Sequence, residues 1–250
     1  MPGLHANRGA KRAREARAEL GLGEAEPAGC LLTLVEERMR IPVGVALFPD
    51  GVAGCCWHDG GRTMLWINGR HAVVRRRFTI AHELGHVRCG HGAGVPVDTP
   101  ATLGDVTQDA REVEANAFAA ELLMPRAGVE GLAGGEPTLE DVVRIAARYG
   151  VSAIAALYRL NTLGLTRRFR TLRSELAEDL HLGVRERLAP EPYDDALARL
   201  GPYDLPRISP LVHAGGLAAV MDGAASVGDV AEAAGVSAER LAGAVARIGA

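Results

Sequence analysis

Three residues within TIAHELGHVRCGH, residues 79–91, have the types and the spacing for metal-dependent hydrolysis. His82 and His86 are four residues apart, so on a helix their rings share one face, about 6 Å apart along the axis, and could bind one ion. Glu83 is rotated by about 100° from His82, so it would flank the ion and take a proton from a bound water molecule. This HExxH pattern favours a metal site over the alternative, an ordinary polar helix face.

A catalytic zinc ion needs a third protein ligand and an open position for water. The segment REVEAN, residues 111–116, offers Glu112 and Glu114. These two lie about 200° apart around a helix, so they cannot both face the ion. We favour Glu112, because Asn116 lies one turn further on the same face and could hold the carboxylate by a hydrogen bond. Glu114 is the alternative ligand, and otherwise we expect it at the rim of the site.

His91 competes for the place of third ligand. The metzincin pattern HExxHxxGxxH requires glycine at position 89 and histidine at position 92, whereas this sequence has Gly90 and His91. We therefore expect His91 at the rim, where it could contact substrate. A second group that stabilises the oxyanion is also expected, and His91, Tyr149 and Tyr158 are the candidates.

The elements that must position these residues form an α+β pattern, a small antiparallel sheet followed by helices. Strand-like runs at 43–48, 52–58 and 63–68 are separated by Asp-Gly and Gly-Gly breaks that suit tight turns. The last run, TMLWIN, could be an edge strand that pairs with an extended substrate. Helices are expected at 31–40, 73–89, 109–123, 138–149 and 152–163.

Three segments of the chain resemble the ImmA/IrrE family of metallopeptidases. They are RFTIAHELGH (77–86), LWIN (65–68) and EVEANAFAAELLMP (112–125). The resemblance covers about residues 30 to 165. It is specific, because a FAAELLMP-type segment at this distance after HELGH is hard to obtain otherwise.

The resemblance implies that His82 and His86 bind zinc, that Glu83 is the general base and that Glu112 is the third ligand. It also implies a reduced thermolysin-like zincin domain with a following helical bundle. The implied substrate is a helix-turn-helix repressor of the XRE type encoded nearby, whose cleavage releases genes for stress response or mobile-element transfer. Mn²⁺ or Fe²⁺ could occupy the same ligands in place of Zn²⁺.

The chain divides into three parts, which are a flexible basic arm over 1–26, the peptidase domain over 27–165 and a helical region of unknown role over 166–250. The first twenty residues lack the apolar core of a signal peptide, and no apolar run approaches the length of a membrane span. We therefore expect a cytoplasmic protein without membrane contacts. The net charge of −3 gives no general attraction to nucleic acid.

Two stretches, 142–160 and 227–245, each contain an alanine-rich helix, the tetrapeptide GVSA and another helix, which is the rhythm of a helix-turn-helix. The first lacks the polar residues that read DNA, and the second offers only Arg240 beside Glu239. The alternative function is thus a regulator that binds DNA or a protein through these helices, with the metal site structural or silent. Glu83 favours the enzyme, since a structural site needs no base.

Overall fold

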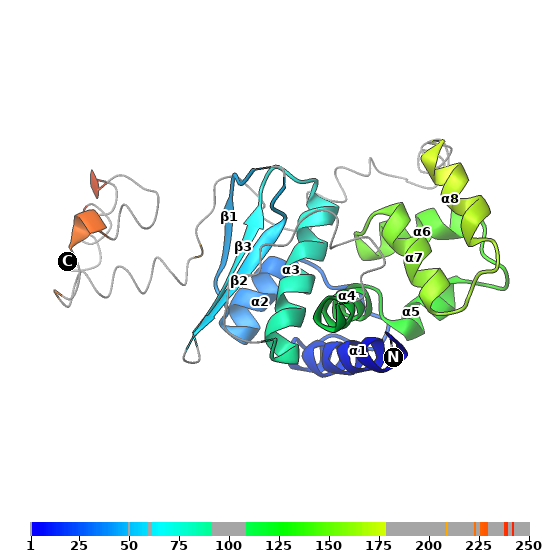
Figure 1. The fold of residues 1–250 in the computed structure, drawn as a ribbon, viewed down its shortest axis with the longest axis horizontal. Helices are drawn as coiled ribbons and strands as arrows, with labels where there is room; N and C mark the ends of the chain where they lie inside the picture. The colour runs from blue at the N-terminus through cyan, green and yellow to red at the C-terminus, as the bar shows by residue number, and fades with distance from the viewer. Residues whose placement is uncertain are drawn as a thin grey trace.

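The computed structural model describes residues 2–49, 51–59, 62–91 and 109–178, with isolated positions beyond residue 200. Within these residues the protein is α+β and mostly helical, with one three-stranded sheet beside the helices (Figure 1). The strands are β1 (Val43–Ala46), β2 (Gly54–Asp59) and β3 (Arg62–Asn68). The helices are α1 (Pro2–Glu19), α2 (Leu31–Met39), α3 (Val73–Cys89), α4 (Ala110–Leu123), α5 (Arg126–Leu132), α6 (Leu139–Tyr149), α7 (Ala153–Thr162) and α8 (Phe169–Ala177).

The sheet is mixed, which corrects the expectation of an antiparallel sheet. β3 lies between β1, with which it pairs in parallel, and β2, with which it forms an antiparallel hairpin. The buried side chain of Asn68 supports this order, because its amide donates to the carbonyls of Pro49 and Val52 at 3.2 and 2.7 Å. Asn68 is the last residue of β3, so these bonds place Pro49 and Val52, which follow β1 and precede β2, at the end of β3. β1 and β2 therefore lie on either side of β3.

β3 is therefore the central strand, and the expectation that TMLWIN is an edge strand is wrong. Its residues pair with β1 on one side, where Val43 opposes Leu65, and with β2 on the other, where Cys56 opposes the same residue. In the described sheet the edges are β1 and β2. A substrate segment that adds a strand would have to pair with one of these.

α3 packs against β2 and β3 of the sheet and also against α4. α1 in turn packs along α4 (Figure 1). Leu65 and Ile67 of β3 join Ile80 and Leu84 of α3 in one buried apolar cluster. The helix ends at Gly90, whose φ of 73° is the left-handed conformation that glycine adopts without strain. Both bounds of this helix agree with the prediction.

The N-terminal segment is a packed helix, whereas the sequence led us to expect a flexible arm over 1–26. Gly9, Ala13 and Ala16 form a buried stripe at helical spacing, and α1 packs along α4. Arg17, which is 3% exposed, donates to the carbonyl of Leu122 at 2.6 Å. The stripe consists of the smallest residues, which give a weak hydrophobic signal in a sequence but bring two helix backbones close together.

The predicted helices at 138–149 and 152–163 correspond to α6 and α7. Gly150, with a φ of 61°, turns the chain between them, and the Ser152 side chain caps α7. The second helix-turn-helix-like stretch, 227–245, lies largely outside the described residues. In the part of the chain that the structure describes, every helix is too short or too polar to cross a membrane.

Candidate metal centre

His82 and His86 lie side by side on the buried face of α3. Their side chains are 0% and 4% exposed, and the two Nε2 atoms are 3.0 Å apart. The short distance follows from the helix, because residues four apart share one face. Two ring nitrogens this close, shielded from water, need a proton or a metal ion between them, since two lone pairs would otherwise face each other.

Glu112 brings a carboxylate to the same point from the first turn of α4. Its Oε2 lies 3.3 Å from Nε2 of His82, and its Oε1 lies 3.4 Å from Nε2 of His86. Ligand atoms bound to one zinc ion at about 2.0–2.2 Å lie about 3.4 Å apart in a tetrahedron, so these three side chains fit one divalent ion. The Glu112 side chain is 14% exposed, so the site reaches solvent on this side.

Each of the two imidazoles has a hydrogen-bond partner at its other ring nitrogen. Nδ1 of His82 lies 3.0 Å from Oδ1 of Asn116, and Nδ1 of His86 lies 2.9 Å from Nδ1 of His91. We expected Asn116 to hold the Glu112 carboxylate, but its amide oxygen contacts the imidazole. A proton donated from Nδ1 leaves the lone pair on Nε2, so both contacts orient the rings for a metal ion.

Glu83 is fully buried on α3 and faces the beginning of β2. A Cβ atom at Gly54 would lie 3.2 Å from Oε1 of Glu83 and 2.7 Å from the carbonyl oxygen of Trp66, so a side chain there would crowd the carboxylate. Gly54 thus leaves the space that Glu83 occupies beside the sheet. Sequence reasoning missed this residue, although a glycine inside a strand-like run often marks the close approach of another group.

The side chains of Glu114 and His91 are largely shielded from solvent, although His91 as a whole residue is only half-buried, whereas we expected both at the rim. Their side chains are 3% and 8% exposed, and Nε2 of His91 lies 3.0 Å from Oε2 of Glu114. The other carboxylate oxygen contacts His5 and Arg8 of α1, at 2.9 and 3.2 Å. Burial acts to raise the pKa of Glu114, but hydrogen bonds with His5 and His91 and the charge of Arg8 outweigh it, so this pKa is lowered.

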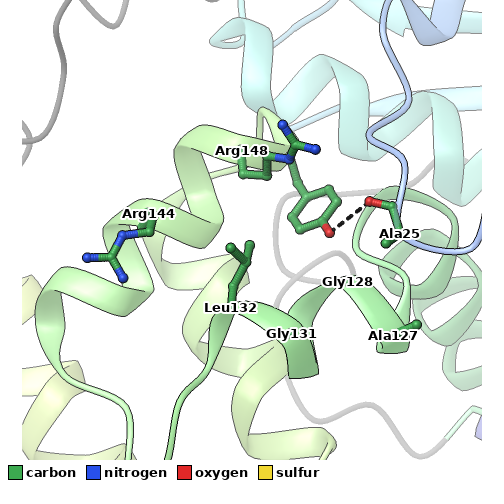
Figure 2. A pocket seen from close by; sticks show the side chains of 8 residues that line it. Ala25, Ala127, Gly128, Gly131, Leu132, Arg144 and Arg148 are labelled. Atoms are coloured by element: carbon green, nitrogen blue, oxygen red, sulfur yellow. Dashed lines mark hydrogen bonds between the residues drawn. The ribbon is translucent and has the colours of Figure 1, made fainter.

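Tyr149 and Tyr158 make their contacts with other elements. The Tyr149 hydroxyl donates to the carbonyl of Ala25 at 3.2 Å and lies against Gly128, at a hollow of about 440 Å³ lined by α5 and α6 (Figure 2). The ring of Tyr158 packs edge-on against Phe169, with 5.1 Å between the ring centres. Among the three candidates for oxyanion stabilisation, the described contacts connect His91 to the histidine pair.

The geometry therefore combines two imidazole nitrogens and a carboxylate oxygen, a donor set that suits a divalent metal ion, with a further buried carboxylate on the same helix. Three protein ligands leave a coordination position open, which is the arrangement of catalytic rather than structural zinc sites. The class of site is that of a metal-dependent hydrolase.

Comparison with known proteins agrees with this class. Residues 49–161 match the family described as the IrrE N-terminal-like domain, a peptidase family. The chain is 37% identical over 91 residues to the uncharacterized immunity region protein 2 of Bacillus phage phi105, a match that covers 36% of this chain and 56% of that protein. It is 34% identical over 110 residues to the radiation response metalloprotease IrrE of Deinococcus radiodurans, which covers 42% of this chain and 34% of that protein.

Residues 49–161 of this chain match this peptidase family, in agreement with the resemblance of the motifs to the ImmA/IrrE family. This segment contains the helices that carry His82, His86 and Glu112. It begins after α1 and α2, so His5 and Arg8 lie outside the family match. The chain spans 56% and 34% of the lengths of these two relatives.

Proposed function

We propose that this protein is a zinc-dependent endopeptidase that cleaves a peptide bond in a regulatory protein. His82, His86 and Glu112 hold the ion, and Glu83 is the general base. The observation that carries the proposal is the convergence of the two Nε2 atoms and the Glu112 carboxylate, with contacts of 3.0–3.4 Å, together with the buried carboxylate of Glu83 on the helix that carries the two histidines. A structural site has no use for such a base, and zinc favours this donor set.

A zinc ion bound by these residues would supply Lewis acidity to a water molecule and to the scissile carbonyl. The Glu83 carboxylate accepts a proton from the attacking water while the water oxygen bonds to the carbonyl carbon. The carbon–nitrogen bond then breaks, and Glu83 returns the proton to the leaving amine. The carboxylate lies between α3 and the beginning of β2, which shields it from bulk water.

The substrate in this proposal is a helix-turn-helix repressor of the XRE type, encoded near the gene, in stress response or mobile-element control. The match to the peptidase family and the names of the two relatives, an immunity region protein and a radiation response metalloprotease, support this choice. An extended substrate segment would pair with the edge of β2, because Gly54 of this strand adjoins Glu83.

The test is to incubate the protein with that repressor, with and without Zn²⁺, and to identify the products by mass spectrometry. We expect one discrete cut that disappears with a chelator and slows by a factor of at least about 10² in Glu83→Gln. The control Glu130→Gln changes an exposed carboxylate of α5 that pairs with Arg126, so it should cut like the wild type.

Equal rates for Glu83→Gln and the wild type would show that the base is assigned to the wrong residue. If the repressor stays intact, and the protein binds operator DNA with an affinity that falls steeply as salt rises, the alternative function as a regulator would be favoured over the peptidase.

A further inference from the structure

A chain of hydrogen bonds connects His86 with the N-terminal helix. Nδ1 of His86 contacts Nδ1 of His91 at 2.9 Å, and Nε2 of His91 contacts Oε2 of Glu114 at 3.0 Å. Oε1 of Glu114 contacts His5 and Arg8 of α1. We call His91 and Glu114 the relay, since they lie between α1 and the proposed ligand.

The relay determines which ring nitrogen of His86 carries the proton. Arg8 is always charged and keeps the Glu114 carboxylate ionised, so Nε2 of His91 must donate to it. A neutral His91 then has a lone pair on Nδ1, and Nδ1 of His86 must donate to that lone pair. The lone pair of His86 is thereby placed on Nε2, the atom that lies 3.0 Å from Nε2 of His82.

A second metal site at the relay is the competing interpretation, because Cys89, His91 and Glu114 also offer ligand atoms within 4.8 Å of one another. A metal ion on Nε2 of His91 would move the proton of this ring to Nδ1, which would then donate to Nδ1 of His86 and leave the lone pair of neutral His86 on the nitrogen that faces away from His82. Arg8 adds a positive charge at 3.2 Å from Glu114. Burial, followed by the charge of Glu114, raises the pKa of Cys89 to about 11, so a metal ion at this place would first have to displace a firmly held thiol proton.

α1 is held in place by contacts beyond the relay. Gly9 lies so close to α4 that a Cβ atom there would come within 3.1 Å of the Glu114 Cα atom. Further along the helix, Ala13 and Ala16 are buried, and Arg17 donates to the carbonyl of Leu122. Changes at His5 or Arg8 should therefore leave the helix docked.

We propose that α1 is a positioning element of the metal centre, in which His5 and Arg8 hold Glu114 so that the relay sets the tautomer and the orientation of His86. This inference rests on the metal site of the proposed function, but not on its substrate. It assigns a role to a helix that precedes the family match.

The experiment measures the Zn²⁺ affinity of the full chain by competition with a chromophoric chelator. We expect Glu114→Gln to weaken binding about 10- to 100-fold, because an amide no longer forces the tautomer of His91. Arg8→Ala should weaken it less, since His5 remains and Arg8 is half exposed. Lys11→Ala removes a charge from an exposed position of α1 and should leave the affinity unchanged.

Two further readouts separate positioning from a general loss of structure. Ring ¹⁵N NMR of the metal-free protein should show the His86 proton on Nδ1 in the wild type and a mixture of tautomers in Glu114→Gln. The metal-free thermal unfolding midpoint reports whether each variant folds. If Glu114→Gln does not fold, the affinity and the ring spectra of Arg8→Ala decide the question.

Unchanged Zn²⁺ affinity in Glu114→Gln, with one ion bound per chain, would overturn the proposal. Two ions per wild-type chain, with one lost in this variant, would replace the relay by a second metal site. A wild-type chain that binds no Zn²⁺ would refute the relay and the proposed function together. Zinc binding that depends on Glu114 while the repressor stays intact would refute the proposed function alone.

Discussion

Replacing Gly85 with alanine should weaken metal binding, although the change adds one methyl group and removes no ligand. Gly85 lies on α3 between His82 and His86, at a point where α4 comes close. A Cβ atom there would lie 3.1 Å from the Cα atom of Ala115, 3.1 Å from Cβ of Phe118 and 3.2 Å from the Ala115 carbonyl oxygen. Backbone atoms cannot rotate away, so α4 itself must move.

The required movement can be compared with the tolerance of a zinc site. Ordinary contacts of a Cβ atom begin at 3.4 Å, so the two helices must separate by about 0.3 Å or more at this point. Glu112 lies on α4 one turn before Ala115, and zinc–ligand distances vary by only about 0.2 Å. We therefore expect the Zn²⁺ affinity to fall on the order of 10-fold. The added methyl group should also lower the free energy of unfolding by about 1–3 kcal/mol through overpacking. The higher helix propensity of alanine offsets up to about 1 kcal/mol of this loss.

The assay is chelator competition for Zn²⁺ together with urea unfolding of the metal-free protein. Gly131→Ala is the matched control, because this glycine lies inside α5 and a Cβ atom there meets nothing within 4 Å. The control should keep the affinity and gain up to about 1 kcal/mol of stability. A Gly85→Ala protein that binds Zn²⁺ as tightly as the wild type would refute the idea that the α3–α4 distance controls the site.

Two further predictions concern the frame around the centre. Arg77→Met should lower the free energy of unfolding by about 3–5 kcal/mol, because the fully buried guanidinium donates to the carbonyls of Ala28 and Gly150 and its loss leaves buried acceptors unpaired. Urea titration that finds a loss under about 1 kcal/mol would contradict this. Glu136→Gln should lower the thermal midpoint at pH 7, because the hydroxyl of Thr166 and then neighbouring backbone N–H groups bind the carboxylate and lower its pKa. Since this pKa is lower in the folded than in the unfolded state, the stabilisation is present above the ordinary value of 4.5 and is lost as the pH falls through the lowered pKa. The difference between variant and wild type should therefore vanish in acid, and a difference that persists there would contradict the reasoning.

The candidate site was predictable where it depends on the geometry of a single helix. The bounds of α3 follow from hydrophobic periodicity and from Gly90, and both are properties of neighbouring residues. Rotation about one helix axis showed that Glu112 and Glu114 could not both face the ion. The position of Asn116 favoured Glu112, which is the residue beside the histidine pair, although Asn116 itself contacts His82. The same rotation led us to expect Glu83 as the base, and the resemblance of the motifs to a family implied the same role.

The sequence by itself thus determined which side chains share a helix face, because the helical period acts over a few residues. Tertiary structure alone decided the partners of those faces. The contact between His5 and Glu114 joins residues 109 apart, and β3 became central only because the chain from β1 crosses its end at Asn68. Such pairings depend on how whole elements dock. The stripe of glycine and alanine in α1 has too weak a hydrophobic signal to predict from the sequence that this face packs against α4.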